Sequence, residues 1–215
     1  MRLFIILSCL LVTTYSGMAQ ITFTGKYVSN NSENFQAKFG LDQGDLRQGF
    51  ELGLGYWFRL KNKRLEFIPE IGFSSLSTPE GLDATGLHLD LNVLIYPLDF
   101  HNDCNTCPTF SKEGGLIKKG FHWIIAPALF RMDVDGSALS EPILSPPSSE
   151  QFTSWRIGGG VGLDIGVTNL VTVTPIAMLY FGKPTTESLV PDIRSGYRQI
   201  HIGLRSTWRF DKDKW

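Results

Sequence analysis

The feature that most constrains this chain is an alternation of apolar and polar residues with a period of two. In segment 50–60, for example, Phe50 and Leu52 share one face, while Glu51 and Gly53 share the other. Successive side chains of a β-strand point to opposite faces, so this pattern predicts strands with one apolar side. The same pattern or an apolar run recurs in 64–74, 87–97, 120–131, 154–167, 171–181 and 198–210, and a weaker first strand lies within 21–29.

Alternation alone fits either a soluble barrel or a membrane barrel, and the chemistry of the polar face separates the two. That face is rich in glycine, as in Gly158, Gly160 and Gly162, and carries Arg, Asp, Glu and His. Glycine is disfavoured in solvated strands but fits a narrow lumen. The opposite face has almost no charge, and an arginine at mid-bilayer would cost about 2–4 kcal/mol. We therefore expect an all-β fold, a membrane-spanning antiparallel up-and-down β-barrel of about eight strands.

The connections alternate in length, as they do in outer-membrane barrels, where periplasmic turns are short and external loops are long. Tight turns are expected at 61–63 and 168–170. Long polar connections are expected at 30–49, 75–86, 132–153 and 182–197. Segment 99–119 breaks the rule, because it is long but falls on the periplasmic side, and we interpret it as a periplasmic insert. The strand count stays open if 21–40 contributes two strands.

The N-terminus has the features of an export signal. Arg2 precedes an apolar run over residues 3–12, and Gly17-Met18-Ala19 supplies the small residues that a signal peptidase recognises. We expect cleavage after Ala19, so that 1–19 is a signal peptide and 20–215 is one outer-membrane barrel domain. Acylation of Cys9 is the alternative for the leader. The net charge of −1 offers no footprint for nucleic acid.

Two cysteines of the insert, Cys104 and Cys107, are candidates for a local disulfide, because the periplasm is oxidising. His101 and Asp103 nearby leave a metal site open as an alternative, although a structural zinc site usually has four ligands. Free thiols are the third possibility. We expect neither a metal nor a cofactor.

The polar face predicts charges inside the barrel. Six of them form the candidate lumen network: Glu51, Glu70, Asp90, Arg156, His201 and Arg205. They could line an ion-conducting or ligand-binding lumen, or close it as a salt-bridged plug. Eight strands leave room for little more than side chains, which favours the plug. The apolar face carries Ser206 but no histidine, so a lipid-facing nucleophile would lack a base, and we expect no enzyme.

With these features the chain resembles the outer-membrane protein β-barrel family, including small OmpA/OmpX-type and PorT-like barrels. The resemblance rests on the signal ending at Gln20, the alternating strands, the stretch 158–163 and the final segment 200–210. It implies that an aromatic residue of the last strand is read by the barrel-assembly machinery. The candidates here are Trp208, Phe210 and Trp215.

The expected role is that of a non-enzymatic outer-membrane barrel with a structural or binding task, through its external loops or the 99–119 insert. The expected partners are outer-membrane lipid and lipopolysaccharide, the assembly machinery and a protein bound at the insert. A PorT-like component of an export or assembly machine and a narrow, porin-like pore are the alternatives. A lipid A-modifying enzyme is disfavoured.

Overall fold

The computed structural model describes residues 20–31, 48–60, 64–77, 83–98, 117, 120–135, 149–168, 170–184 and 197–209. The expected export signal, Cys104, Cys107, Phe210 and Trp215 lie outside these residues, so the predictions made for them stay predictions. No helix among the described residues is long and apolar enough to cross a membrane.

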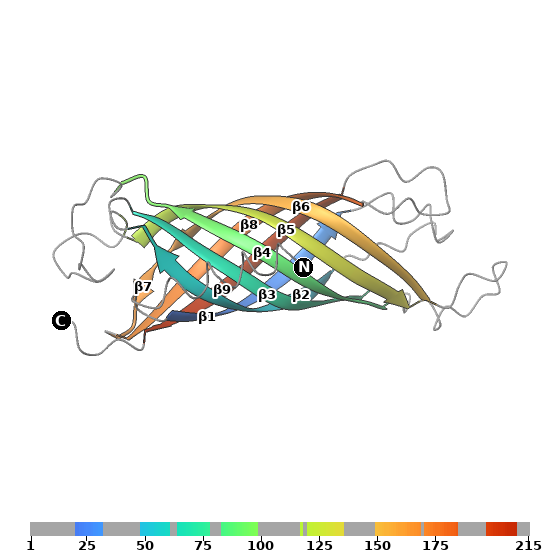
Figure 1. Cartoon of the computed structure of the whole chain (residues 1–215), viewed down its shortest axis with the longest axis horizontal. Coiled ribbons are helices and arrows are strands. Elements are labelled where there is room, and N and C mark those ends of the chain that lie inside the picture. The colour runs from blue at the N-terminus through green and yellow to red at the C-terminus, as the bar shows by residue number, and fades with distance from the viewer. Residues whose placement is uncertain are drawn as a thin grey trace, which may run out of the picture.

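The described residues form one antiparallel sheet that closes into a barrel (Figure 1). Its strands are β1 (Gln20–Asn31), β2 (Gln48–Arg59), β3 (Leu65–Ser77), β4 (Asp83–Ile95), β5 (Phe121–Asp135), β6 (Ser149–Leu163), β7 (Ile165–Gly166), β8 (Val171–Pro184) and β9 (Tyr197–Arg209). β6 and β7 lie in line beside β8, separated by Asp164 alone, so they act as one interrupted strand. Neighbours in the chain pair in order, and β1 pairs with β9 to close the sheet. The expected eight-stranded up-and-down barrel is therefore confirmed.

One end of the barrel holds the short connections. Leu60 N donates to Leu65 O at 3.1 Å across the connection between β2 and β3. Val171 N donates to Thr168 Oγ1 at 3.0 Å, which closes the expected tight turn before β8. β1 begins and β9 ends at this same end, beside each other. We call it the turn end and the opposite one the loop end.

At the loop end the strands are longer than the sequence predicts. The alternation predicts a loop over 75–86, yet β3 and β4 stay paired as far as Ser77 and Asp83. β5 and β6 likewise stay paired as far as Asp135 and Ser149. A ladder of backbone hydrogen bonds needs no apolar side chains, so it continues where the apolar face has ended. The predicted loop boundaries are therefore wrong, and the barrel wall extends beyond its apolar band.

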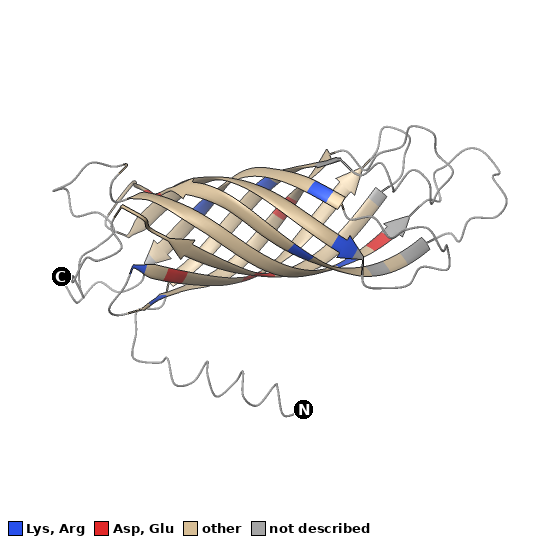
Figure 2. Cartoon of the chain, turned by 90° about the horizontal axis from the view of Figure 1, so that it is seen from above, with Lys and Arg blue, Asp and Glu red and all other residues tan. Residues whose placement is uncertain are grey.

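The exterior of the barrel is apolar. Leu89 and Ile202 are 55% and 59% exposed, although both lie in mid-strand. Other exposed apolar side chains around the wall include Phe23, Leu52, Leu54, Ile71, Phe73, Leu87, Leu91, Ile125, Leu129, Ile157, Val161, Ile200 and Leu204. In Figure 2 each strand is mostly tan, with charged residues at scattered positions. The predicted orientation, with the apolar face outward, is confirmed.

The interior is filled by side chains of both kinds. One apolar cluster joins β5 to β8 and contains Ile124, Ala126, Ile176, Met178 and Tyr180. A second joins β3 to β4 and contains Ile68, Leu94 and Tyr96, with Trp57 packed against it. The burial pattern also resolves segment 171–181, whose two faces are both apolar in sequence: Thr172, Thr174 and Ile176 point inward.

Candidate functional site

The centre of the lumen is occupied by the ammonium group of Lys26. Its Nζ lies 3.5 Å from Glu51 Oε2, 3.2 Å from Glu70 Oε1 and 3.3 Å from Asp90 Oδ2. Strand register brings these groups together, because Lys26 is the direct partner of Glu51, and Glu70 is the direct partner of Asp90. Four consecutive strands thus place one cation among three carboxylates.

Arg156 reaches the same carboxylates from the opposite wall. Its Nη1 donates to Glu51 Oε1 at 2.8 Å and its Nη2 to Glu51 Oε2 at 3.2 Å, a paired geometry that suits guanidinium and carboxylate. Nη2 also lies 3.6 Å from Asp90 Oδ1, and Nη1 donates to Gln199 at 3.1 Å. The guanidinium stacks over the ring of Tyr180, with its Cζ 4.5 Å from the ring centroid. Arg156 therefore ties the β2–β4 wall to the β6–β9 wall across the lumen.

Two histidines border this cluster. His201 Nδ1 lies 3.4 Å from Glu51 Oε2, and its ring packs at 4.5 Å from that of Tyr180. His88 Nε2 lies 3.9 Å from Asp90 Oδ2, and neither ring nitrogen of His88 has a hydrogen-bond partner. All these side chains are buried. We call Lys26, Glu51, Glu70, Asp90, Arg156 and His201 the central network.

One group of side chains in and beside the central network has the composition of a metal site but not its arrangement. Glu51, His88 and Asp90 each offer a ligand atom, and the three atoms lie within 4.8 Å of one another. The ammonium of Lys26 lies within 3.5 Å of both carboxylates, and Arg156 contacts both as well. The position of a cation is thus taken by side chains, and the residues do not fit a metal.

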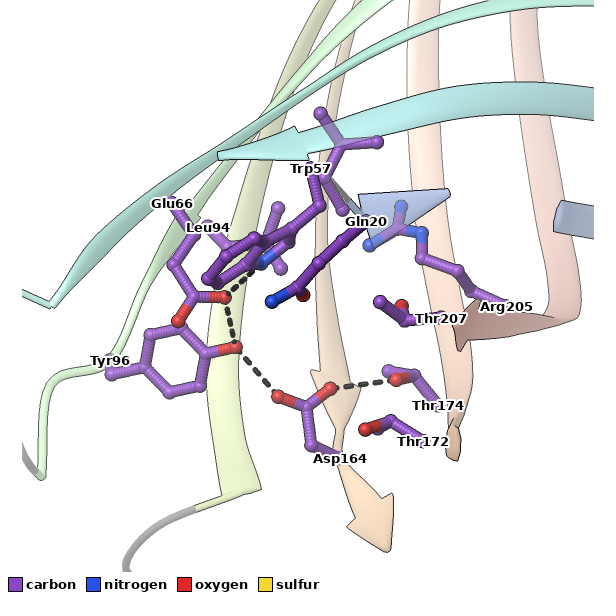
Figure 3. Close-up of a pocket in the computed structure, with 11 residues that line it drawn as sticks. Gln20, Trp57, Glu66, Leu94, Tyr96, Asp164, Thr172, Thr174, Arg205 and Thr207 are labelled. Carbon is purple, nitrogen blue, oxygen red and sulfur yellow. Dashed lines mark hydrogen bonds between the residues drawn. The ribbon is translucent and has the colours of Figure 1, made fainter. Parts of the chain in front are cut away.

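A second polar cluster lies nearer the turn end (Figure 3). Tyr96 OH lies 2.9 Å from Glu66 Oε2 and 2.6 Å from Asp164 Oδ2, between the two carboxyl groups. Trp57 Nε1 donates to Glu66 at 2.8 Å, and Thr174 Oγ1 donates to Asp164 at 2.6 Å. The free space in this pocket is about 10 Å³, room for about one water molecule. The cluster therefore closes the lumen on this side with side chains.

Arg205 lines this second pocket and does not join the central network. None of its three guanidinium nitrogens has a hydrogen-bond partner, and no ion pair joins it to an acid among the described residues. Glu70, another member of the candidate lumen network, contacts Lys26 and accepts a hydrogen bond from Thr24 Oγ1 at 2.6 Å. Of the six lumen residues suggested by the sequence, five belong to the central network with Lys26, and Arg205 does not.

Lys26 itself is absent from the candidate residues taken from the sequence. It lies in the first strand, whose alternation is weak, on the face opposite Phe23 and Tyr27. That alternation is the signal that could identify it. Trp208, the described member of the expected assembly signal, is exposed on the exterior, and its Nε1 donates to Ser206 Oγ at 2.8 Å.

The fold is similar to solved outer-membrane proteins. A major outer membrane protein from Thermus thermophilus aligns with a TM-score of 0.51 and 9% identity over 89% of this chain and 99% of that one. Neisserial surface protein A aligns with a TM-score of 0.49 and 11% identity over 90% and 99% of the two chains. The N-terminal β-barrel domain of OprF from Pseudomonas aeruginosa aligns with a TM-score of 0.48 and 12% identity over 88% and 97%. No family model and no curated protein sequence matches the chain.

At identities this low the similarity concerns the fold alone. Chain closure between β1 and β9, the apolar exterior and the charged interior are the features on which that fold depends. This chain therefore has the fold of the small outer-membrane β-barrels of the OmpA/OmpX type.

Proposed function

We propose that the protein is an outer-membrane barrel whose lumen is closed by its own side chains, and that it acts without catalysis through the surfaces it presents outside the lumen. The observation that carries the proposal is the central network, in which Arg156 and Lys26 join opposite walls through shared carboxylates. A conducting pore needs hydrated space along its axis, and here buried ion pairs occupy the axis instead.

The exterior supports a place in the membrane. Exposed leucine, isoleucine and valine side chains would be costly in water over such an area, whereas a bilayer accepts them. Aromatic side chains are exposed toward both ends of the wall, such as Trp208 at the turn end and Trp155 toward the loop end. The short connections at the turn end suit the periplasmic side. In this orientation the loop end faces the outside of the cell.

The histidines argue against lipid-modifying chemistry. His88, His122 and His201 are all buried in the lumen. Among the described side chains, none of these bases can therefore reach an exterior hydroxyl such as that of Ser206. Hydrolysis or acyl transfer on a membrane lipid needs a nucleophile with a base within hydrogen-bond reach.

The test of a closed lumen is single-channel conductance in planar bilayers. The wild-type barrel should give no steady open state. K26A/R156A, which truncates the two cations that bridge the walls, should give one if it inserts as a folded barrel. K183A/R198A is the matched control, because it removes two cations from the exterior, and it should stay silent. A wild-type conductance equal to that of K26A/R156A would reject the proposal.

The external task is tested by capture of partners from detergent-solubilised membranes. Variants lacking insert 99–119 or an external loop separate a periplasmic partner from an external one. Loss of one partner only from the insert-deleted variant would place the task in the periplasm. Identical profiles for all variants would contradict a role for these segments.

A further inference from the structure

The outer wall of the barrel differs in charge from one side to the other at the loop end. On β1 to β4, the outward-facing described side chains at this level are hydroxyls and amides: Ser29, Gln48, Ser75, Ser77 and Thr85. On β8 and β9 they are Lys183 and Arg198, both exposed. Figure 2 shows both Lys or Arg positions and an Asp or Glu position near the strand ends farthest from the C-terminus. We call Lys183 and Arg198 the basic pair.

Strand register makes the basic pair close neighbours. Arg198 lies directly opposite Phe181, and Lys183 follows on the same face of β8 two residues later. Diagonal neighbours of this kind have Cα atoms about 7–8 Å apart, within reach of long side chains. No acidic side chain among the described residues forms an ion pair with either cation. Within the described part of the chain, the repulsion between the two positive charges is therefore not offset by an acidic side chain.

Arg131 on β5 is a contrasting case on the same side of the barrel. Its Nη2 donates to Gln151, whose amide in turn donates to Asp133. An acidic group of the chain thus lies near this arginine, while the described side chains offer none to the basic pair. On the outer face of the loop end, the cations without an acidic neighbour among the described residues therefore lie on β8 and β9.

The basic pair lies beside apolar side chains on the same outer face. Trp155 is the cross-strand partner of Lys183, and Phe181 is that of Arg198. Both rings are about half exposed, at 46% and 53%, and Ile200 continues the apolar surface toward mid-barrel. Aromatic side chains mark the level where acyl chains give way to headgroups. The basic pair, which is directly opposite these rings in the ladder, therefore lies at this boundary, and Ile200, two residues nearer mid-barrel on β9, lies on its acyl-chain side.

We propose that this surface binds the phosphate-bearing headgroup of a glycolipid of the outer leaflet, of the lipid A class, with its acyl chains along Phe181, Trp155 and Ile200. The assignment rests on the proposed membrane orientation, which places the loop end in the outer leaflet. One phosphate between Lys183 and Arg198 removes their repulsion and accepts charge-assisted hydrogen bonds from both. The surface faces sideways along the wall, so its ligand has to lie in the plane of the bilayer.

The experiment measures lipid binding to the full-length barrel in detergent by native mass spectrometry. The probes are bis-phosphorylated lipid A, the same lipid without phosphates, and phosphatidylglycerol. Wild type should prefer the bis-phosphorylated form by about tenfold or more, since each basic residue near an anionic headgroup contributes to affinity. K183Q/R198Q should lose that preference, while K183R/R198K should keep it.

The control variant K61Q/K63Q also removes two positive charges, but from the connection between β2 and β3. It should bind lipid like wild type. An unchanged preference in K183Q/R198Q would overturn the proposal. Equal affinity for phosphatidylglycerol, lost to the same extent, would overturn the assignment to a glycolipid. Heat-dependent migration in gels confirms that each variant is folded. Conductance is measured separately, so failure of lipid binding is distinguishable from failure of the closed-lumen proposal.

Discussion

At the scale of single residues, Lys26 is central to the charges of the lumen. Its ammonium contacts three carboxylates from three neighbouring strands, and Arg156 contacts two of the same three. Carboxylates buried this close together repel each other strongly in a medium of low dielectric. Removing a buried cation therefore leaves a charge without compensation, which costs more than losing the ion pair itself.

The first prediction compares two possible partners of Glu70. Lys26→Met should destabilise the barrel by about 3–5 kcal/mol, because it leaves buried carboxylates without their cation. Lys26→Met and Glu70→Gln together should cost less than the sum of the single changes, with a coupling of about 0.5–3 kcal/mol. Glu70→Gln with Arg205→Gln should be additive within about 0.5 kcal/mol, because no contact joins that pair. Urea unfolding in lipid vesicles measures all three.

Strong coupling between Glu70 and Arg205, together with additivity for Lys26 and Glu70, would contradict this arrangement of the lumen. The sequence alone is compatible with either pairing of Glu70, with Lys26 or with Arg205. Alternation identifies Glu70, Asp90 and Arg205 as inward-facing, since facing is a local property of a strand. Which acid meets which base depends on register between strands distant in sequence, and alternation alone leaves that register open.

At the scale of single strands, β6 shows why the lumen face is rich in glycine. A Cβ atom on Gly160 would lie 2.3 Å from the backbone oxygen of Ala177 on β8. A Cβ atom on Gly162 would lie 2.4 Å from His122 Nε2. Gly159, on the exterior, has nothing within 4 Å of a Cβ. The alternation of β6 is thus an alternation of available space as well as of polarity.

The second prediction uses the adjacent pair Gly159 and Gly160. Gly160→Ala should destabilise the barrel by about 1–3 kcal/mol, because the backbone of β8 has to move to admit a methyl group. Gly159→Ala should be neutral or stabilising by up to about 1 kcal/mol, because it mainly reduces the freedom of the unfolded chain. Urea titration of both variants in vesicles checks this. Equal effects would show that the close approach of β6 and β8 is not maintained.

Strand number and strand faces are predictable from the sequence, whereas strand ends at the loop end are not. Ser75, Ser77, Thr85 and Gly86 fall within the predicted loop 75–86, because serine, threonine and glycine give no apolar alternation. Their backbone groups pair in the ladder all the same. Hydrophobic alternation records only the part of a strand that has one face in apolar surroundings, so it ends where the apolar band ends.

On the scale of the whole molecule, the polarity of an ordinary soluble domain is reversed. Lysine, arginine, glutamate and aspartate side chains are buried inside, and leucine and isoleucine side chains are exposed over the wall. Burying ion pairs is costly in any surroundings, so this arrangement is stable only where the exterior gains from an apolar solvent. Among the described residues, the filled interior then leaves the outer surface of the barrel as the surface available for function.

The third prediction tests that reversal through its dependence on depth. Leu89 and Thr85 lie on the same outward face of β4, Leu89 within the apolar band and Thr85 toward the loop end. Leu89→Arg should cost about 2–4 kcal/mol in lipid vesicles, because a charge has to be placed near mid-bilayer, while Thr85→Arg should cost about 0–1 kcal/mol near the interface. The same pair in detergent micelles, which deform easily around a charge, should show a smaller difference. Equal, small costs for both variants in vesicles would mean that the apolar band does not face lipid. The membrane orientation would then be wrong, and with it the argument for the closed lumen and for the lipid site.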